Sequence, residues 1–155
     1  MSPDCLFETH LNVRDLNRSM SFYRDVIGLE PAYVLPERHV AFFWIGGRGS
    51  TMLGLWSGSS SPNIMRLHIA FRLDVEAVRA APAILRAVGV EPLDFYGQPT
   101  TEPSVIGWMP AASVFFHDPD GHLLEYLAML PHQSCPQVGV VPHGEWLARW
   151  AREPA

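Results

Sequence analysis

Three side chains that can bind a metal ion stand within strand-like segments of this sequence. His10 lies in CLFETHLNVRD, His68 in LHIAFRL, and Glu125 in HLLEYLAML, directly after the turn sequence DPDG. Two neutral imidazoles and one carboxylate can hold a divalent first-row metal and leave two or three coordination positions open. Fe, Mn, Ni, Co and Zn all fit such ligands. If the three side chains meet in the fold, we expect a metal site with open coordination positions, which serves catalysis or ligand capture.

Each of these residues also has a structural interpretation. A single His on a strand is most often hydrogen-bonded within the fold, and a single Glu near a strand end is most often solvated. For Glu125 this is a weaker explanation, because an unpaired carboxylate inside an apolar strand costs free energy. The structural interpretation is adopted for the histidines that adjoin turns or chain breaks, which are His39, His117 and His122. The DPDG segment is interpreted as turn chemistry at Asp118, Asp120 and Gly121.

A repeated pattern supplies the elements that would position these side chains. In the first copy, alternation predicts a strand at 6–13, Asp15 caps a helix that Gly28 ends, and strands follow at 31–35, 40–45 and 51–56. The second copy repeats this with a strand at 67–73, a helix between Asp74 and Gly89, and strands at 92–95, 112–117 and 122–128. We therefore expect one domain over 1–155, with βαβββ modules at about 5–57 and 64–130, a polar linker at 57–63 and a tail at 131–155.

Overlaying the two copies relates the candidate ligands to one another. His10 and His68 fall at the same place in the first strands, on the side opposite the apolar residues that should pack beneath the helices. Glu125 overlays Gly54 in the last strands. Since the helices cover one face of each sheet, the free faces are predicted to enclose a cleft that all three candidate ligands line.

The residues quoted above resemble a known family. The repeat, the opening HLNVRDLNRSMSFYRDVIGLEP, the His at the start of each module and the ending FFHDPDGHLLEY are similar to the vicinal oxygen chelate superfamily, over about Leu6 to Leu130. That superfamily contains glyoxalase I, extradiol dioxygenases, methylmalonyl-CoA epimerase, and the fosfomycin- and bleomycin-resistance proteins. The resemblance implies an α+β fold of two tandem βαβββ modules forming a glyoxalase-like cleft, with a short C-terminal helical tail. It also implies a homodimer, a small-molecule substrate or ligand, and one divalent metal ion held by His10, His68 and Glu125.

The residue at position 54 bears on the reaction. Gly54 offers no side chain, whereas glyoxalase-type isomerisation in this superfamily uses a carboxylate near this position as ligand and base, and the epimerases need a proton-transfer group there. A facial set of two His and one carboxylate is typical of non-haem iron oxygenases, so the sequence favours dioxygenase-type chemistry. The alternatives are a glyoxalase-like lyase or isomerase, a fosfomycin-type resistance enzyme, and a non-catalytic protein that sequesters a drug or small ligand. Glu8 or Tyr96 could supply a missing base.

Further residues could shape a substrate pocket. The segment 96–110 is long for a loop in a compact domain and is predicted to be a binding loop or lid, with Trp108 in its apolar lining. Asn12 lies beside His10, and Trp56 shares the strand face of Gly54. In the tail, a short helix pattern at 144–150 carries Trp146 and Trp150 on one face, and we expect it to dock on a sheet edge, a partner subunit or the mouth of the cleft.

Composition excludes several classes of partner. The formal net charge is −5, and the 11 Lys and Arg residues form no run, so neither nucleic acid nor an anionic membrane is expected as a partner. No apolar run is long enough to span a bilayer, and the start MSPDCLFETH lacks the features of a secretory signal, which predicts a cytoplasmic protein. Cys5 and Cys135 have no paired spacing and are expected to be simple thiols.

Overall fold

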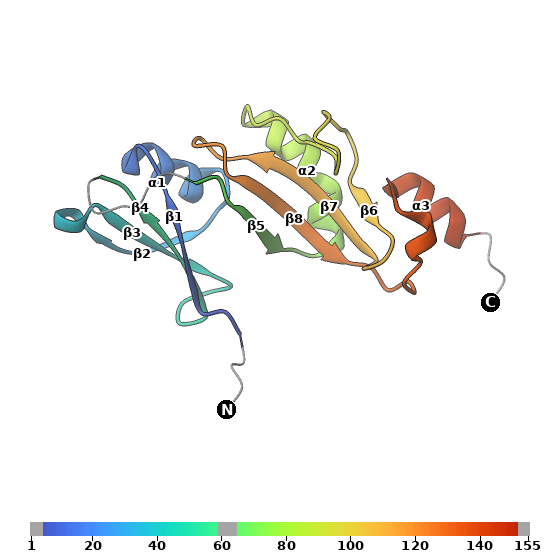
Figure 1. The fold of residues 1–155 in the computed structure, drawn as a ribbon, viewed down its shortest axis with the longest axis horizontal. Helices are drawn as coiled ribbons and strands as arrows, with labels where there is room; N and C mark the ends of the chain where they lie inside the picture. Colours follow the sequence, from blue (N-terminus) through green and yellow to red (C-terminus); the bar gives the residue numbers. More distant parts are fainter. Residues whose placement is uncertain (1–4, 59–64, 152–155) are drawn as a thin grey trace. The chain divides into compact units, whose positions relative to one another are not determined.

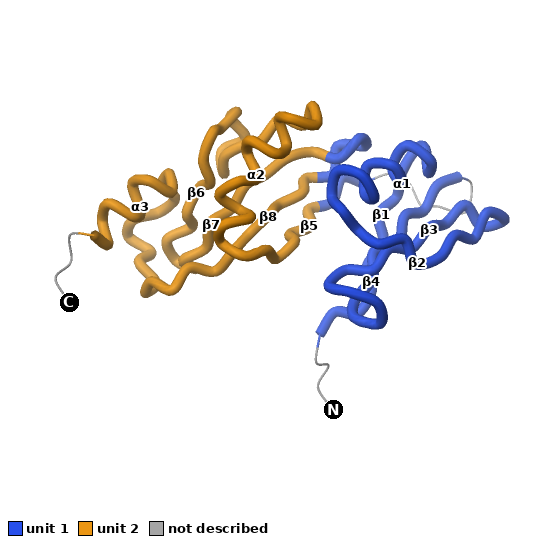
Figure 2. The backbone as a smooth tube through the Cα atoms, turned by 180° about the vertical axis from the view of Figure 1, so that it is seen from behind, with its two compact units in different colours: residues 1–67, 118–122 blue, residues 68–117, 123–155 orange. Residues whose placement is uncertain are grey.

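The computed structural model describes residues 5–58 and 65–151, and they form two compact units (Figures 1 and 2). Unit 1 comprises 1–67 and 118–122, and unit 2 comprises 68–117 and 123–155. Each unit contains one βαβββ-like module with a mixed sheet, so the α+β fold expected from the sequence is confirmed. The linker expected at 57–63 falls largely outside the described residues.

Unit 1 is a four-stranded sheet with one α-helix. Its elements are β1 (Glu8–Asn12), α1 (Leu16–Asp25), β2 (Glu30–Leu35), a 3-10 turn (Pro36–Arg38), β3 (Val40–Ile45) and β4 (Thr51–Trp56). The strand order is β1-β4-β3-β2, in which β1 and β4 are parallel and the other pairs are antiparallel. The predicted alternation is seen at the end of β1 and the residue that follows it, where Leu11 and Val13 are buried, whereas Phe7 on the same face is about half exposed.

Unit 2 is a five-stranded sheet with two α-helices. Its elements are β5 (His68–Arg72), α2 (Val75–Ala87), β6 (Ser104–Ile106), β7 (Ala111–His117), β8 (Leu123–Met129), a 3-10 turn (Pro136–Val138), β9 (Val140–Pro142) and α3 (His143–Trp150). The strand order is β5-β8-β7-β6-β9, with only the β5–β8 pair parallel. Helix α2 packs across β7 and β8 (Figure 1) and buries Val78, Ala81, Pro82 and Leu85.

The helix starts follow the capping residues recognised in the sequence. The Asp15 carboxylate accepts the backbone N–H of Arg18 at 3.0 Å, and the Asp74 carboxylate accepts that of Ala77 at 2.7 Å. Each bond satisfies one of the N–H groups that lack a partner within the first helical turn. The two helices therefore begin where the sequence predicts.

The strand expected at 92–95 does not form, and a strand appears instead in the segment expected to be a lid. Leu93 makes only isolated bridges to Pro99 and Phe115. The Asp94 carboxylate accepts the backbone N–H groups of Tyr96 and Gln98, both at 2.8 Å, which turns the chain away from the sheet. Segment 104–106 then enters the sheet as β6, buried and paired on both sides, so this part of 96–110 is core and not a lid.

The tail docks on the edge of the sheet in unit 2. Strand β9 pairs with β6, and α3 follows it directly. Trp146 is fully buried, and its indole N–H donates to His132 Nδ1 at 3.0 Å. Of the three docking places expected for the tail, the structure places it at the sheet edge.

The turn between β7 and β8 belongs to unit 1 and contacts α1 there. Asp118 accepts the backbone N–H groups of Asp120 and His122 at 2.9 and 2.8 Å, which is the turn chemistry expected from the sequence. Its other oxygen accepts the Tyr23 hydroxyl at 3.0 Å, and burial together with this carboxylate raises the pKa of Tyr23. Asp120 accepts Arg18 Nη2 at 2.9 Å and the Ser19 hydroxyl at 3.3 Å. These two residues therefore anchor a helix in addition to shaping the turn.

Candidate metal centre

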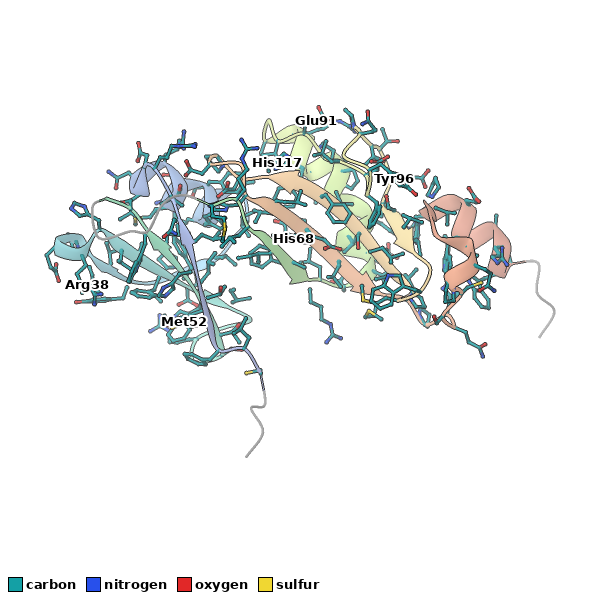
Figure 3. The ribbon with its side chains drawn as sticks, viewed as in Figure 1. Arg38, Met52, His68, Glu91, Tyr96 and His117 are labelled. Carbon is teal, nitrogen blue, oxygen red and sulfur yellow. The ribbon has the colours of Figure 1, made fainter. Side chains whose placement is uncertain are left out.

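In unit 2 the structure brings two of the candidate ligands together. His68 projects from β5 (Figure 3), and its Nε2 lies 3.1 Å from Oε2 of Glu125 on the neighbouring strand β8. The Glu125 side chain is 7 % exposed, and its other oxygen, Oε1, is buried without a hydrogen-bond partner among the described residues. An unsatisfied buried carboxylate oxygen is costly, so this position calls for a bound cation or proton. The residues therefore fit a divalent metal.

In unit 1 the His10 ring is held by its neighbours on the sheet. Its Nε2 lies 2.7 Å from Oε1 of Glu8, two residues back on the same strand. Its ring centroid is 5.2 Å from that of Trp56 and 5.8 Å from that of Phe42. The imidazole and the carboxylate are each about one-third exposed, so the pair is accessible from solvent.

The space above Gly54 is filled by the ring of His10. His10 and Gly54 are direct partners across the β1–β4 pair. A Cβ at position 54 would lie 2.3 Å from Cδ2 and 2.7 Å from Nε2 of His10. Position 54 therefore accommodates only glycine while the His10 ring keeps this place.

Strand pairing also corrects the overlay of the two first strands. Gly54 is opposite Phe42, and Glu125 is opposite Phe115, so these last-strand positions correspond as expected. On the other side, however, Gly54 pairs with His10, whereas Glu125 pairs with Ala70. His10 and His68 share a strand face but stand two residues apart in register.

The full ligand set expected from the sequence is divided between the units. His10 belongs to unit 1, and His68 and Glu125 belong to unit 2. Within 5–58 and 65–151, no group of three or more His, Cys, Asp or Glu side chains is arranged to hold a metal ion. The three-residue site remains a prediction.

The weaker site candidates have different surroundings. Trp56 lies beside His10, and the Arg38 guanidinium is 5.6 Å from the centroid of its ring. The carbonyl oxygen of Asn12 is 2.9 Å from Nε2 of the buried His122. Trp108 and Tyr96 are about two-thirds exposed in unit 2, and Tyr96 packs edge-on against Phe95. Among these candidates, Trp56 packs beside the ring of His10, and Glu8 lies 2.7 Å from it.

The histidines given a structural interpretation differ in their surroundings. His122 has no exposed surface, and its Nδ1 accepts the backbone N–H of Leu67 at 3.1 Å, so it is a hydrogen-bonded core residue. His39 follows the 3-10 turn with a positive φ of 52°, and His117 is exposed at the end of β7. Sequence reasoning missed the contact of Gly54 with His10, because it depends on the pairing of β1 with β4. It also missed the contact of Glu8 with His10, which is local to β1, where residues i and i+2 share a face.

The fold agrees with that of known proteins. A family model of the glyoxalase/bleomycin resistance protein/dioxygenase superfamily matches residues 6–126, so the chain belongs to this superfamily. A comparison with curated proteins found no matching relative. None of the helices in the described residues is long and apolar enough to cross a membrane.

Several solved structures are similar to this chain. An integron cassette protein from the mobile metagenome of a Halifax Harbour sewage outfall is 29 % identical, with a TM-score of 0.70 over 82 % of this chain and 100 % of that one. A lactoylglutathione lyase from Agrobacterium tumefaciens is 26 % identical, with a TM-score of 0.64 over 83 % and 96 %. The fosfomycin resistance protein FosX from Listeria monocytogenes, in complex with Mn(II) and sulfate, is 27 % identical, with a TM-score of 0.58 over 84 % and 94 %.

Proposed function

We propose that this protein is a divalent-metal-dependent enzyme that acts on a small molecule with two neighbouring oxygen atoms. The observation that carries the proposal is Glu125, a buried carboxylate with one unsatisfied oxygen and a His68 imidazole 3.1 Å from the other. His68 and Glu125 would hold the ion with His10 as the third ligand. Similarity to a manganese-containing fosfomycin resistance protein supports the metal.

When bound, the ion would supply a Lewis acid that polarises the two substrate oxygens. The residues of this chain have separate tasks. The buried carboxylate of Glu125 would offset the positive charge of the ion. The half-exposed His68 would leave the ion accessible to substrate from solvent. Trp56 and Phe42 hold the orientation of the His10 ring by packing against it. Glu8 is placed to take up or release a proton at the exposed end of β1.

Two reactions are consistent with these residues. Dioxygenase-type chemistry is supported by the ligand types, because His10, His68 and Glu125 would hold the ion with two imidazoles and one carboxylate, the set typical of non-haem iron oxygenases. A lyase or isomerase reaction is the second candidate, and Glu8 favours it, because this carboxylate gives the Gly54 side of the module a base. A relative that is a lactoylglutathione lyase supports the second candidate. Sequestration of a ligand without turnover is the alternative of a different class.

Metal titration tests the proposal. His68→Ala and Glu125→Gln are each expected to weaken binding of Mn(II) to the metal-free protein at least tenfold, because two remaining ligands hold a first-row ion poorly at an open site. The matched control is His117→Ala, which replaces an exposed histidine at the end of β7 and should leave the affinity for Mn(II) unchanged. Calorimetry that finds wild-type affinity in His68→Ala contradicts the metal site.

Activity assays separate the candidate reactions. The protein is reconstituted without oxygen with Fe(II), Mn(II), Ni(II) or Zn(II), then assayed on a catechol panel with an oxygen electrode and on methylglyoxal with glutathione. Oxygen uptake with Fe(II) supports the dioxygenase, and glutathione-dependent isomerisation with Ni(II) or Zn(II) supports the lyase or isomerase. Stoichiometric metal in protein purified without added metal favours an enzyme, and its absence favours ligand sequestration. A homodimer is also part of the proposal, and light scattering would show twice the 17.3 kDa of one chain.

A further inference from the structure

Unit 2 contains a cavity of about 290 Å³ at the end of its sheet where β6 pairs with β9. One wall is the loop 94–103 that leads into β6, and the other is β9. All of its lining residues belong to unit 2, whose strands β5 and β8 lie toward the other end of the sheet. The match to the family model ends at residue 126, so the wall from β9 comes from a segment that this model does not describe. The size of the cavity is close to the lower limit of typical small-molecule sites.

Two carboxylates line this cavity, and each uses one oxygen to hold the backbone in place. Asp94 Oδ1 accepts the backbone N–H groups of Tyr96 and Gln98, both at 2.8 Å. Glu102 Oε2 accepts the backbone N–H of Gly144 at 2.8 Å, which ties the loop to the first turn of α3. Within the ranges 5–58 and 65–151, Asp94 Oδ2 and Glu102 Oε1 have no hydrogen bond or ion pair. Two anionic oxygens are therefore left for a ligand.

The negative charge of this pair is not neutralised by its surroundings. Among the described residues that line the cavity there is no Arg, Lys or His. Arg86 reaches the loop from α2, but its Nη2 donates to the Thr100 carbonyl at 2.6 Å and to Glu91 at 3.2 Å. His143 follows β9, and burial lowers the pKa of its imidazole, which keeps the ring neutral at neutral pH. The cavity therefore presents net negative charge.

The other walls suit an apolar chain next to a charged group. The Tyr96 side chain is 68 % exposed and stands on the loop (Figure 3). Pro99, Val140 and Pro142 supply apolar surface. An aromatic face attracts an organic cation, and proline and valine side chains accept methylene groups. A metal ion fits less well, because these apolar side chains offer no ligands and no three acidic, His or Cys side chains gather to hold one among the described residues.

We propose that this cavity binds a small organic cation, such as an aliphatic guanidinium, through the carboxylates of Asp94 and Glu102. A guanidinium has donors for both carboxylates, and its aliphatic chain would contact the apolar wall from β9. Both carboxylates are already held by backbone N–H groups, which limits the ordering cost of binding. This site is separate from the candidate metal centre and does not rest on the proposed function.

The test uses butylguanidinium and butylurea, a pair of probes with nearly the same shape and different charge. Each is titrated into the full chain at low ionic strength, and binding is followed by calorimetry and by the amide NMR signals of 94–104 and 140–144. Butylguanidinium should bind with a Kd of about 1 mM or below, and butylurea about tenfold more weakly. Added salt should weaken binding of the cation, because it screens the charges of a partly exposed site.

Two substitutions remove the charge and keep the backbone hydrogen bonds. Asp94→Asn and Glu102→Gln each retain an oxygen that can accept the same N–H groups, so the loop and α3 should stay in place. Each should weaken butylguanidinium binding about fivefold or more, because a charge-assisted hydrogen bond is lost. The matched control is Glu145→Gln, which neutralises an exposed carboxylate in the first turn of α3 and should leave the Kd unchanged. Tyr96→Ala should weaken binding about threefold, whereas Tyr96→Phe should not.

Each outcome bears on the proposed cation site. Weaker binding in both carboxylate variants, with wild-type binding in Glu145→Gln, supports it. Equal affinity for the two probes, or no binding of butylguanidinium up to about 10 mM, overturns it. An unchanged Kd in both Asp94→Asn and Glu102→Gln shows that the cation binds elsewhere and also overturns it. If a variant fails to fold, the wild-type NMR shifts and the Tyr96 variants decide, and shifts confined to residues outside 94–104 and 140–144 overturn the site.

Discussion

Glu125 occupies a position that protein stability alone would not select. Its side chain is almost fully buried on β8, and one of its oxygens has no partner among the described residues. Burying such a group costs free energy that an apolar residue of similar size would avoid. A residue retained at this cost is expected to serve binding or catalysis, where stability is often exchanged for function.

Glu125→Met tests, in the metal-free protein, whether Glu125 lowers stability in return for metal binding. The free energy of unfolding should rise by about 1–3 kcal/mol, because the unsatisfied oxygen is removed and the apolar surroundings are kept. Metal affinity should be lost in the same variant. Urea denaturation in the presence of a chelator measures the first effect, and Glu91→Met, at an exposed carboxylate, is the control. A clear loss of stability in Glu125→Met contradicts the inference that this carboxylate is strained without its ion.

At the scale of elements, α1 is held to its unit by polar contacts as well as by apolar packing. Only Ser19 and Tyr23 of this helix are buried. Both hydroxyls donate to the carboxylates of the 118–122 turn, Tyr23 to Asp118 and Ser19 to Asp120. A short helix with so little buried apolar surface depends on such anchors, since helices of this length are marginal in isolation.

Asp120→Ala is therefore expected to lower the free energy of unfolding by about 2–3 kcal/mol, because it removes charge-assisted hydrogen bonds and leaves the Ser19 hydroxyl buried without a partner. The half-exposed arginine partners can return to water, which limits the loss. Asp25→Ala is the control, because Asp25 forms an exposed pair with Arg24 and its replacement should leave the free energy of unfolding nearly unchanged. Equal losses in the two variants, measured by urea denaturation, would rule out the anchoring role.

At the scale of the whole molecule, metal binding and folding are linked. A ligand that binds only the folded chain at a concentration of 100 times its Kd stabilises that chain by about 2.7 kcal/mol. For a chain of this size, this corresponds to a rise in Tm of roughly 5–10 °C. Removal of the metal with a chelator should lower the Tm by this amount.

The same scan of His68→Ala should show a chelator effect of about half this size or less, because the affinity falls at least tenfold while the half-exposed position tolerates alanine. Differential scanning calorimetry with and without Mn(II) measures both proteins. A chelator effect of the same size in His68→Ala would mean that the ion binds elsewhere on the chain.

The features that the sequence determined by itself are those with local causes. Asp15 and Asp74 cap the helices because a carboxylate can accept a backbone N–H three residues on, wherever the helix finally packs. The DPDG turn forms from hydrogen bonds within five residues, and the alternation in β1 is visible without its partner. Repetition of these local signals, together with the motifs, was sufficient to predict the two modules and the family. The assignment of His68 and Glu125 as ligands stays a prediction.

Only the tertiary structure decided which residues stand side by side. A shift of two residues in register leaves every side chain on the same face, so the pattern of apolar residues could not show that His68 corresponds to Glu8. The strands β6 and β9 have three residues each, too few for alternation to reveal them, and they form because each completes the hydrogen bonds of the other. The place of His10 over Gly54 likewise follows from the pairing of distant strands, which is a non-local interaction that no short stretch of sequence encodes.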